Sequence, residues 1–122
     1  AQAILNRVGL GDRAHVRAAN LSHGELRLLE LAIALAGDPK FLLLDEPMAG
    51  LGRTESAALV TLLAELRGTL PMLLVEHDMD AIFQLADTVS VLVDGTVVAR
   101  GTPDEVRASP AARAAYLGEG TE

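Results

Sequence analysis

Two short segments of the chain are apolar at every position. Residues 41–44 read FLLL and residues 72–75 read MLLV, and neither run alternates with polar residues. Continuous runs of this kind are typical of strands that are covered on both faces. We therefore expect two buried strands, of which the first ends at Asp45 and the second at Glu76.

Helix signals precede the first of these strands. An opening helix ends near Val8 and is stopped by Gly9, because glycine favours the left-handed position after a helix. A second helix begins at Ser22, which forms an S-x-x-E capping box with Glu25, and it runs to Ala36. Two helices are thus predicted before the first strand.

A third helix is predicted between the two strands. Thr54 is placed to cap it, and Gly68 closes it. Its apolar stripe consists of leucines at helical spacing: Leu59, Leu62, Leu63 and Leu66.

The rest of the chain predicts a hairpin and short helices. Asp94 and Gly95 stand between TVSVLV and TVVAR, and Asp-Gly is the strongest short hairpin signal. A short helix is expected at about 79–86, and Thr102 and Ser109 each cap a terminal helix that begins with proline. The order of elements indicates an α/β fold with a parallel core and an antiparallel edge.

Composition narrows the class of protein. The chain has 122 residues, the length of one domain, and only 2% are aromatic, so the core is built from aliphatic side chains. A formal net charge of −7 argues against non-specific binding to nucleic acid or to an anionic lipid surface. The absence of cysteine excludes disulfides and thiolate metal sites. Because no apolar run has the roughly 18 residues of a membrane span and no signal peptide is visible, we expect a cytoplasmic protein.

Candidate chemistry lies at the carboxyl ends of the two strands, where ligands bind in open α/β sheets. Asp45 and Glu46 are adjacent there, and one of these carboxylates can hold Mg²⁺, often through water, while its neighbour polarises an attacking water. The alternative is that Asp45 caps a turn and Glu46 is merely solvated. His77 follows the second strand and can donate to a phosphate oxygen, although strand-end histidines more often bond to backbone.

The pentapeptide LSHGE, residues 21–25, is a second candidate. A helix start exposes unpaired N–H groups and a partial positive charge, and both attract anions. Gly24 permits close approach of a ligand to the backbone, and the Ser22 hydroxyl can donate to it. The alternative is that Ser22 and Glu25 only cap the helix.

LSHGE, FLLLDEP and LLVEHD, in this order, resemble the carboxyl half of an ABC-transporter ATP-binding subunit. Residues 21–25 resemble the family signature LSGGQ, and residues 41–46 resemble its Walker B strand. Residues 49–52 resemble the D-loop, and His77 resembles the switch histidine. The resemblance implies a partial P-loop NTPase fold, with parallel strands, flanking helices, a C-terminal hairpin and short terminal helices.

In this family two ATPase subunits meet head to tail, and each ATP lies between one subunit's phosphate loop and the other's signature helix. The resemblance therefore implies that Ser22, Gly24 and Glu25 contact the ATP of a partner subunit. It places Gly50 and Gly52 in the D-loop beside it.

The resemblance also assigns roles at the strand ends. Asp45 would support Mg²⁺ through water, and Glu46 would act as the general base. His77 would contact the γ-phosphate and the attacking water. These roles suit phosphoryl transfer, which needs positioning and charge stabilisation.

Several positions depart from the family pattern. His23 replaces the first glycine of the signature, and Glu25 replaces its glutamine. Gly52 stands where the D-loop usually ends in aspartate, so any contact from that carboxylate is lost or replaced. Leu26 and Leu28 stand where polar residues commonly follow the signature.

The family's phosphate loop, G-x-x-x-x-G-K-[ST], does not occur in the sequence, in which Lys40 is the only lysine. We therefore expect about the C-terminal half of a longer protein, which alone binds ATP poorly and hydrolyses it negligibly. Residues 1–37 would end the helical subdomain, and residues 38–122 would belong to the ATPase core. Apolar surface left uncovered by the missing half predicts self-association.

DEPMAGLG, VEHDMD and the closing AYLGE most resemble the ATPase subunits of branched-chain amino acid importers. Those ATPase subunits lie at the inner face of the cell membrane and act with transmembrane permeases. They act only indirectly with a solute-binding protein. Urea or amide importers and lipopolysaccharide exporters are close alternatives. Two further alternatives are a non-catalytic interaction remnant of the fold and half of a DNA-repair ATPase. The latter carries a coiled coil and a basic face, which are not visible here.

Overall fold

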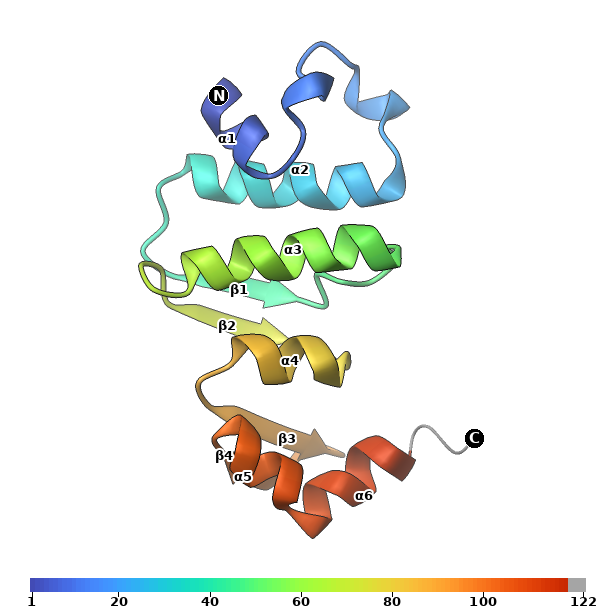
Figure 1. Ribbon diagram of the computed structural model, residues 1–122, viewed down its shortest axis with the longest axis vertical. Coiled ribbons are helices and arrows are strands. Elements are labelled where there is room, and N and C mark those ends of the chain that lie inside the picture. Colours follow the sequence, from blue (N-terminus) through green and yellow to red (C-terminus); the bar gives the residue numbers. More distant parts are fainter. Residues whose placement is uncertain (119–122) are drawn as a thin grey trace. The chain divides into compact units, whose positions relative to one another are not determined.

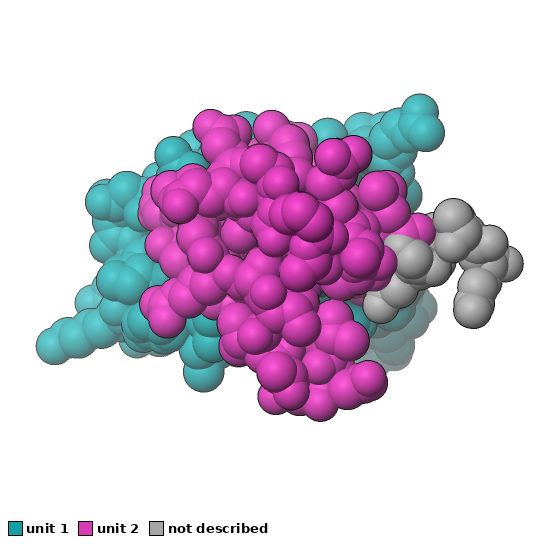
Figure 2. All heavy atoms as spheres, turned by 90° about the horizontal axis from the view of Figure 1, so that it is seen from below, with its two compact units in different colours: residues 1–76 teal, residues 77–122 magenta. Residues whose placement is uncertain are grey.

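The computed structural model describes residues 1–118. The chain divides into two compact units, residues 1–76 and the residues from His77 onward, which are coloured separately in Figure 2. The subdomain boundary expected after residue 37 falls inside the first unit and stays a prediction.

Three helices of the first unit agree with the expected positions. Helix α1 spans Gln2–Arg7, α2 spans His23–Ala36 and α3 spans Arg53–Leu66 (Figure 1). Gly9 follows α1 with a φ of 85°, the left-handed conformation predicted for it. Two short 3-10 turns, Gly11–Arg13 and Ala18–Asn20, connect α1 to α2.

The start of α3 differs from the prediction. The N-cap is Gly52, and Thr54 already lies inside the first turn. The backbone N–H of Gly52 donates to Oε2 of Glu55 at 3.3 Å, so the carboxylate of Glu55 ties down the helix start. This contact of a Glu three residues after the cap is one half of a capping box, and it places the helix start before Thr54.

Strand β1, Leu42–Asp45, and strand β2, Met72–Val75, form a parallel pair. Leu42 pairs with Met72 and Asp45 pairs with Val75, so both strands end at the same edge. The leucine stripe of α3 is buried, and Leu63 at its centre is only 1% exposed. A cavity of about 210 Å³ lies among α2, β1 and α3 and is lined in part by Leu31, Leu42 and Leu59.

The expectation that both faces of these strands are covered is wrong for this chain. Leu43 is 69% exposed and Leu73, its register partner, is 55% exposed, whereas Leu42 is buried. Side chains alternate between the faces of a sheet, so α3 covers only one face of the pair. Phe41 and Val75 extend the uncovered face, which we call the open face: Phe41, Leu43, Leu73 and Val75.

The second unit contains the predicted hairpin and its flanking helices. Helix α4 spans Met79–Leu85, strand β3 spans Val89–Val93 and strand β4 spans Thr96–Gly101. Asp94 and Gly95 join the antiparallel strands with φ angles of 49° and 78°, as an Asp-Gly turn requires. Among the described residues, β3 and β4 form a two-stranded sheet of their own rather than an edge of the β1–β2 sheet.

Two capped helices follow the hairpin. Helix α5 spans Pro103–Ala108 and helix α6 spans Pro110–Gly118. Thr102 and Glu105 form a second capping box at the start of α5. The core of this unit is small and aliphatic: Val89, Val106 and Ala112.

Candidate functional site

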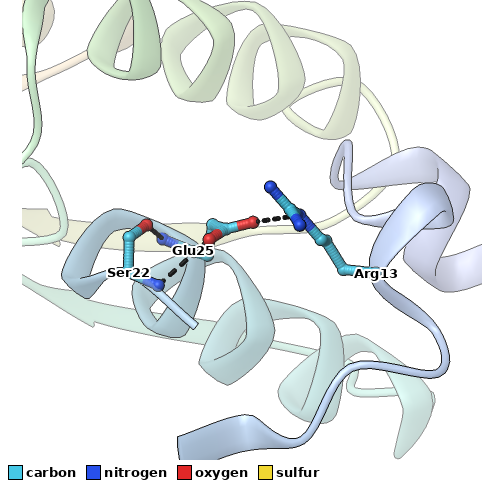
Figure 3. Close-up of polar contacts among 3 residues, drawn as sticks. All are labelled: Arg13, Ser22 and Glu25. Carbon is cyan, nitrogen blue, oxygen red and sulfur yellow. Dashed lines mark hydrogen bonds and ion pairs between the residues drawn. The ribbon is translucent and has the colours of Figure 1, made fainter. Parts of the chain in front are cut away.

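The capping box predicted at the start of α2 is present. Oγ of Ser22 accepts from the backbone N–H of Glu25 at 3.1 Å, and Oε1 of Glu25 accepts from the backbone N–H of Ser22 at 3.0 Å (Figure 3). Ser22 is exposed. Because a hydroxyl that accepts a hydrogen bond keeps its own proton, Ser22 can cap the helix and still donate to an anion. The two interpretations of LSHGE are therefore compatible.

Arg13 adds a contact that the sequence pattern does not reveal. Its Nε lies 2.8 Å from Oε2 of Glu25, so the two carboxylate oxygens of Glu25 have different partners (Figure 3). The Ser22 N–H foremost, and Arg13 in addition, hold the pKa of Glu25 below its ordinary value. Glu25 is therefore a charged group at the helix start.

The start of α2 packs against the start of α3. Gly24 is buried, and a Cβ atom at this position would overlap the carboxylate of Glu55. The same carboxylate accepts the N–H of Gly52. A side chain at position 24 would therefore displace the Glu55 carboxylate, so a neighbour within the chain favours glycine here, in addition to any close approach of a ligand.

His23 brings the signature-like segment to the D-loop-like segment. A Cβ atom on Gly50 would lie 2.5 Å from Nε2 of the His23 ring, and Gly50 has a φ of 77°. Both the ring and the backbone conformation therefore favour glycine at position 50. His23 is one of the two residues that depart from the family signature, and its ring lies against the loop after β1.

Asp45 and Glu46 lie at the carboxyl end of β1, as predicted, and both are exposed. Glu46 has a φ of 47°, a conformation that few residues other than glycine adopt without cost. Its N–H donates to the carbonyl oxygen of Val75 at 2.7 Å, which holds the turn against the end of β2. The strand pair thus presents the Glu46 carboxylate on a fixed backbone.

Glu76 provides a second bond between these strand ends. Its Oε2 accepts from the backbone N–H of Met48 at 3.1 Å, and Met48 is buried. The sequence pattern predicts Glu76 only as the last residue of a strand. An acid directly before His77 was the available signal, but it did not indicate which amide the acid would meet.

His77 is the first residue of the second unit, whereas the other proposed site residues belong to the first unit. It precedes Asp78, whose carboxylate caps α4 by accepting from the N–H of Ala81 at 3.2 Å. The expectation that His77 acts beside Asp45 and Glu46 stays a prediction.

Neither a cluster of metal-ligating side chains nor a membrane-spanning helix is found in the described part of the chain. Within residues 1–118, no three histidine or acidic side chains converge as a metal site. A magnesium ion that keeps most of its waters and binds nucleotide phosphates needs only one or two protein carboxylates, and Asp45 fits that requirement. No helix in the same part of the chain is long and apolar enough to cross a membrane.

Comparisons with known proteins match both ends of the chain to related families. Residues 1–49 match the family described as ABC transporter, and residues 96–122 match that described as branched-chain amino acid ATP-binding cassette transporter. A crystal structure of the ADP conformation of an ATP-binding cassette of an ABC transporter has a TM-score of 0.81 and 28% identity. It covers 95% of this chain and 48% of that chain.

Curated relatives agree with the family models. LivG of Salmonella typhimurium, a high-affinity branched-chain amino acid transport ATP-binding protein, is 44% identical over 117 residues, covering 94% of this chain and 46% of LivG. LivG of Escherichia coli strain K12 is 43% identical, and BraF of Pseudomonas aeruginosa is 39% identical, with the same coverage. The chain spans about half the length of these relatives. It belongs to the family of ABC-transporter ATP-binding proteins, as its motifs predict.

Proposed function

We propose that this chain forms the signature and Walker B half of an ATP-hydrolysing subunit that powers an ABC importer for branched-chain amino acids. The names of the relatives support the substrate class, because both LivG and BraF are branched-chain amino acid transport proteins. The observation that supports the nucleotide-binding role most is the contact of His23 with Gly50. It brings the helix start and the loop after Glu46 together within one compact unit.

The start of α2 is the proposed contact for the nucleotide of a second ATPase subunit. Ser22 donates its hydroxyl proton to a phosphate oxygen, and the first turn of the helix adds backbone N–H groups and a partial positive charge. Gly50 and Gly52 lie in the loop after β1, and neither has a side chain that would block the approach of the nucleotide to the start of α2.

The end of β1 is the proposed catalytic edge. Asp45 supports Mg²⁺ through water, and Glu46 accepts a proton from the attacking water as it becomes a nucleophile. His77 stabilises charge on the transferred phosphoryl group. The left-handed backbone at Glu46 and its bond to Val75 fix where the general base stands before the nucleotide arrives.

The chain lacks a phosphate loop of the form G-x-x-x-x-G-K-[ST], so by itself it has little affinity for ATP and negligible turnover. The complete subunit pairs head to tail with a second ATPase subunit and binds transmembrane permease subunits at the inner face of the cell membrane. Through the permeases it serves a solute-binding protein. The negative net charge agrees with a protein that binds no nucleic acid.

A chimera tests the catalytic role. This chain replaces the matching 117 residues of E. coli LivG, whose remaining part supplies the other half; we call this protein the LivG chimera. Glu46→Gln should lower ATP turnover at least about a hundredfold, because it removes a general base, while ATP binding persists. Glu65→Gln, an exposed change on α3, is the matched control. Unchanged hydrolysis in the Glu46→Gln chimera would remove Glu46 from the mechanism.

A further inference from the structure

Glu25 brings a full negative charge to the surface on which the proposed function places a phosphate. It replaces the uncharged glutamine of the family signature, and it bonds directly to the backbone of Ser22. A carboxylate and a phosphate at the same helix start repel each other, because like charges at short range raise the free energy of the bound state. Phosphate binding at this helix start therefore requires a positive group that offsets the charge of Glu25, which the common signature with glutamine does not require.

A second carboxylate increases the negative charge near the helix start. The carboxylate of Glu55 lies against Gly24, in the first turn of α2. Its hydrogen bond to the N–H of Gly52 satisfies one oxygen but brings no positive charge. The partial positive charge of the helix start is about half an elementary charge, which is too small to balance two carboxylates and a phosphate.

Arg13 is placed to offset the charge of Glu25. It comes from the short turn that precedes α2, and its guanidinium reaches across to Oε2 of Glu25 while Oε1 stays on the Ser22 amide (Figure 3). Within residues 1–118, it is the basic side chain that pairs with Glu25. Arg27, two residues further along the helix, pairs instead with Glu30 at 3.9 Å.

We propose that Arg13 is a positioning residue that holds Glu25 on the Ser22 amide and offsets its charge, so that the signature helix accepts phosphate although it carries a carboxylate. This proposal rests on the proposed function. Arg13 touches neither nucleotide nor reacting atoms and acts only through Glu25. Its effect on ATP must therefore disappear when Glu25 loses its charge.

A double-mutant cycle in the LivG chimera tests this dependence. Arg13→Gln should raise the KM for ATP about tenfold, because it leaves the carboxylate unpaired beside the phosphate. Arg13→Lys should restore the KM to within about twofold, since it returns the positive charge. In the Glu25→Gln background, Arg13→Gln should change the KM less than about twofold. Arg13 is about half exposed, so these variants leave the packed core intact.

A second measurement separates binding from turnover. In the Glu46→Gln chimera, MgATP-dependent dimerisation, followed by light scattering, should need more ATP when Arg13 is Gln, and the difference should shrink at high salt. If Arg13→Gln weakens ATP binding equally with Glu25 and with Gln at position 25, Arg13 has only a structural role and the proposal is overturned. If Glu46→Gln leaves turnover unchanged, the proposed function fails instead.

Discussion

Single side chains in the first unit tie together segments that lie far apart in the sequence. Glu76 is the clearest case, because its carboxylate holds the buried N–H of Met48 and so joins the end of β2 to the loop after β1. A second hydrogen bond joins the same two segments, because the N–H of Glu46 donates to the carbonyl oxygen of Val75, the residue before Glu76. Two hydrogen bonds therefore fix the backbone on both sides of Pro47, and with it the proposed general base.

Removing the Glu76 carboxylate should loosen this junction. Glu76→Ala leaves the Met48 N–H without its acceptor, and we expect the free energy of unfolding of the chain to fall by about 1–2 kcal/mol. Glu76→Gln keeps an acceptor oxygen and should cost less than about 1 kcal/mol. Urea denaturation followed by circular dichroism measures both values. Glu65→Ala on the exposed face of α3 is the control, and an equal loss in both alanine variants would show that the Met48 bond contributes nothing.

At the scale of elements, predictions succeeded where a few neighbouring residues decide the structure. The Ser22–Glu25 capping box, the Thr102 cap before Pro103 and the Asp94-Gly95 turn are local signals, and the structure confirms all three. The start of α3 differs from the prediction because the carboxylate of Glu55 accepts the N–H of Gly52, which makes Gly52 and not Thr54 the N-cap.

Contacts between elements could not be predicted in the same way. The apolar run at 41–44 reads the same whether one or both faces of a strand are covered. The missing phosphate loop indicated that some apolar surface would be uncovered, but not that Leu43 would be part of it. The contacts of Gly24 with Glu55, His23 with Gly50, and Arg13 with Glu25 join separate segments of the chain. For the proposed site residues, the sequence therefore predicted the amino-acid types and their positions at the ends of helices and strands. It did not predict which residues of other segments they contact.

At the scale of the whole molecule, the open face is the feature that a longer protein or a partner would have to cover. Its four side chains are each more than half exposed, and within residues 1–118 the two strands beneath pair only with each other. Exposed apolar sheet surface promotes pairing with another chain. The 122-residue chain is therefore expected to self-associate in solution.

Size-exclusion chromatography with light scattering tests this expectation. The unmodified chain should show a mass above that of a monomer at high concentration, and Leu43→Lys should shift it toward the monomer by placing a charge on the open face. Leu92→Lys is a matched control in the second unit, because Leu92 is 63% exposed and Leu43 is 69% exposed. A clean monomer at high concentration for the unmodified chain would contradict the expectation.

The two capping boxes also allow the nucleotide role of α2 to be separated from its helix cap. Asp caps a helix as well as Ser does but adds a negative charge. Ser22→Asp and Thr102→Asp therefore make the same kind of change at two caps, only one of which is proposed to meet a phosphate. Both variants should fold.

The most direct measurement is the mass of the Glu46→Gln LivG chimera by light scattering, with and without MgATP. We predict that MgATP about doubles the mass, that Thr102→Asp leaves this doubling intact, and that Ser22→Asp abolishes it through repulsion of the phosphate. A Ser22→Asp chimera that still dimerises at the same ATP concentration would show that the start of α2 does not bind the nucleotide of another subunit.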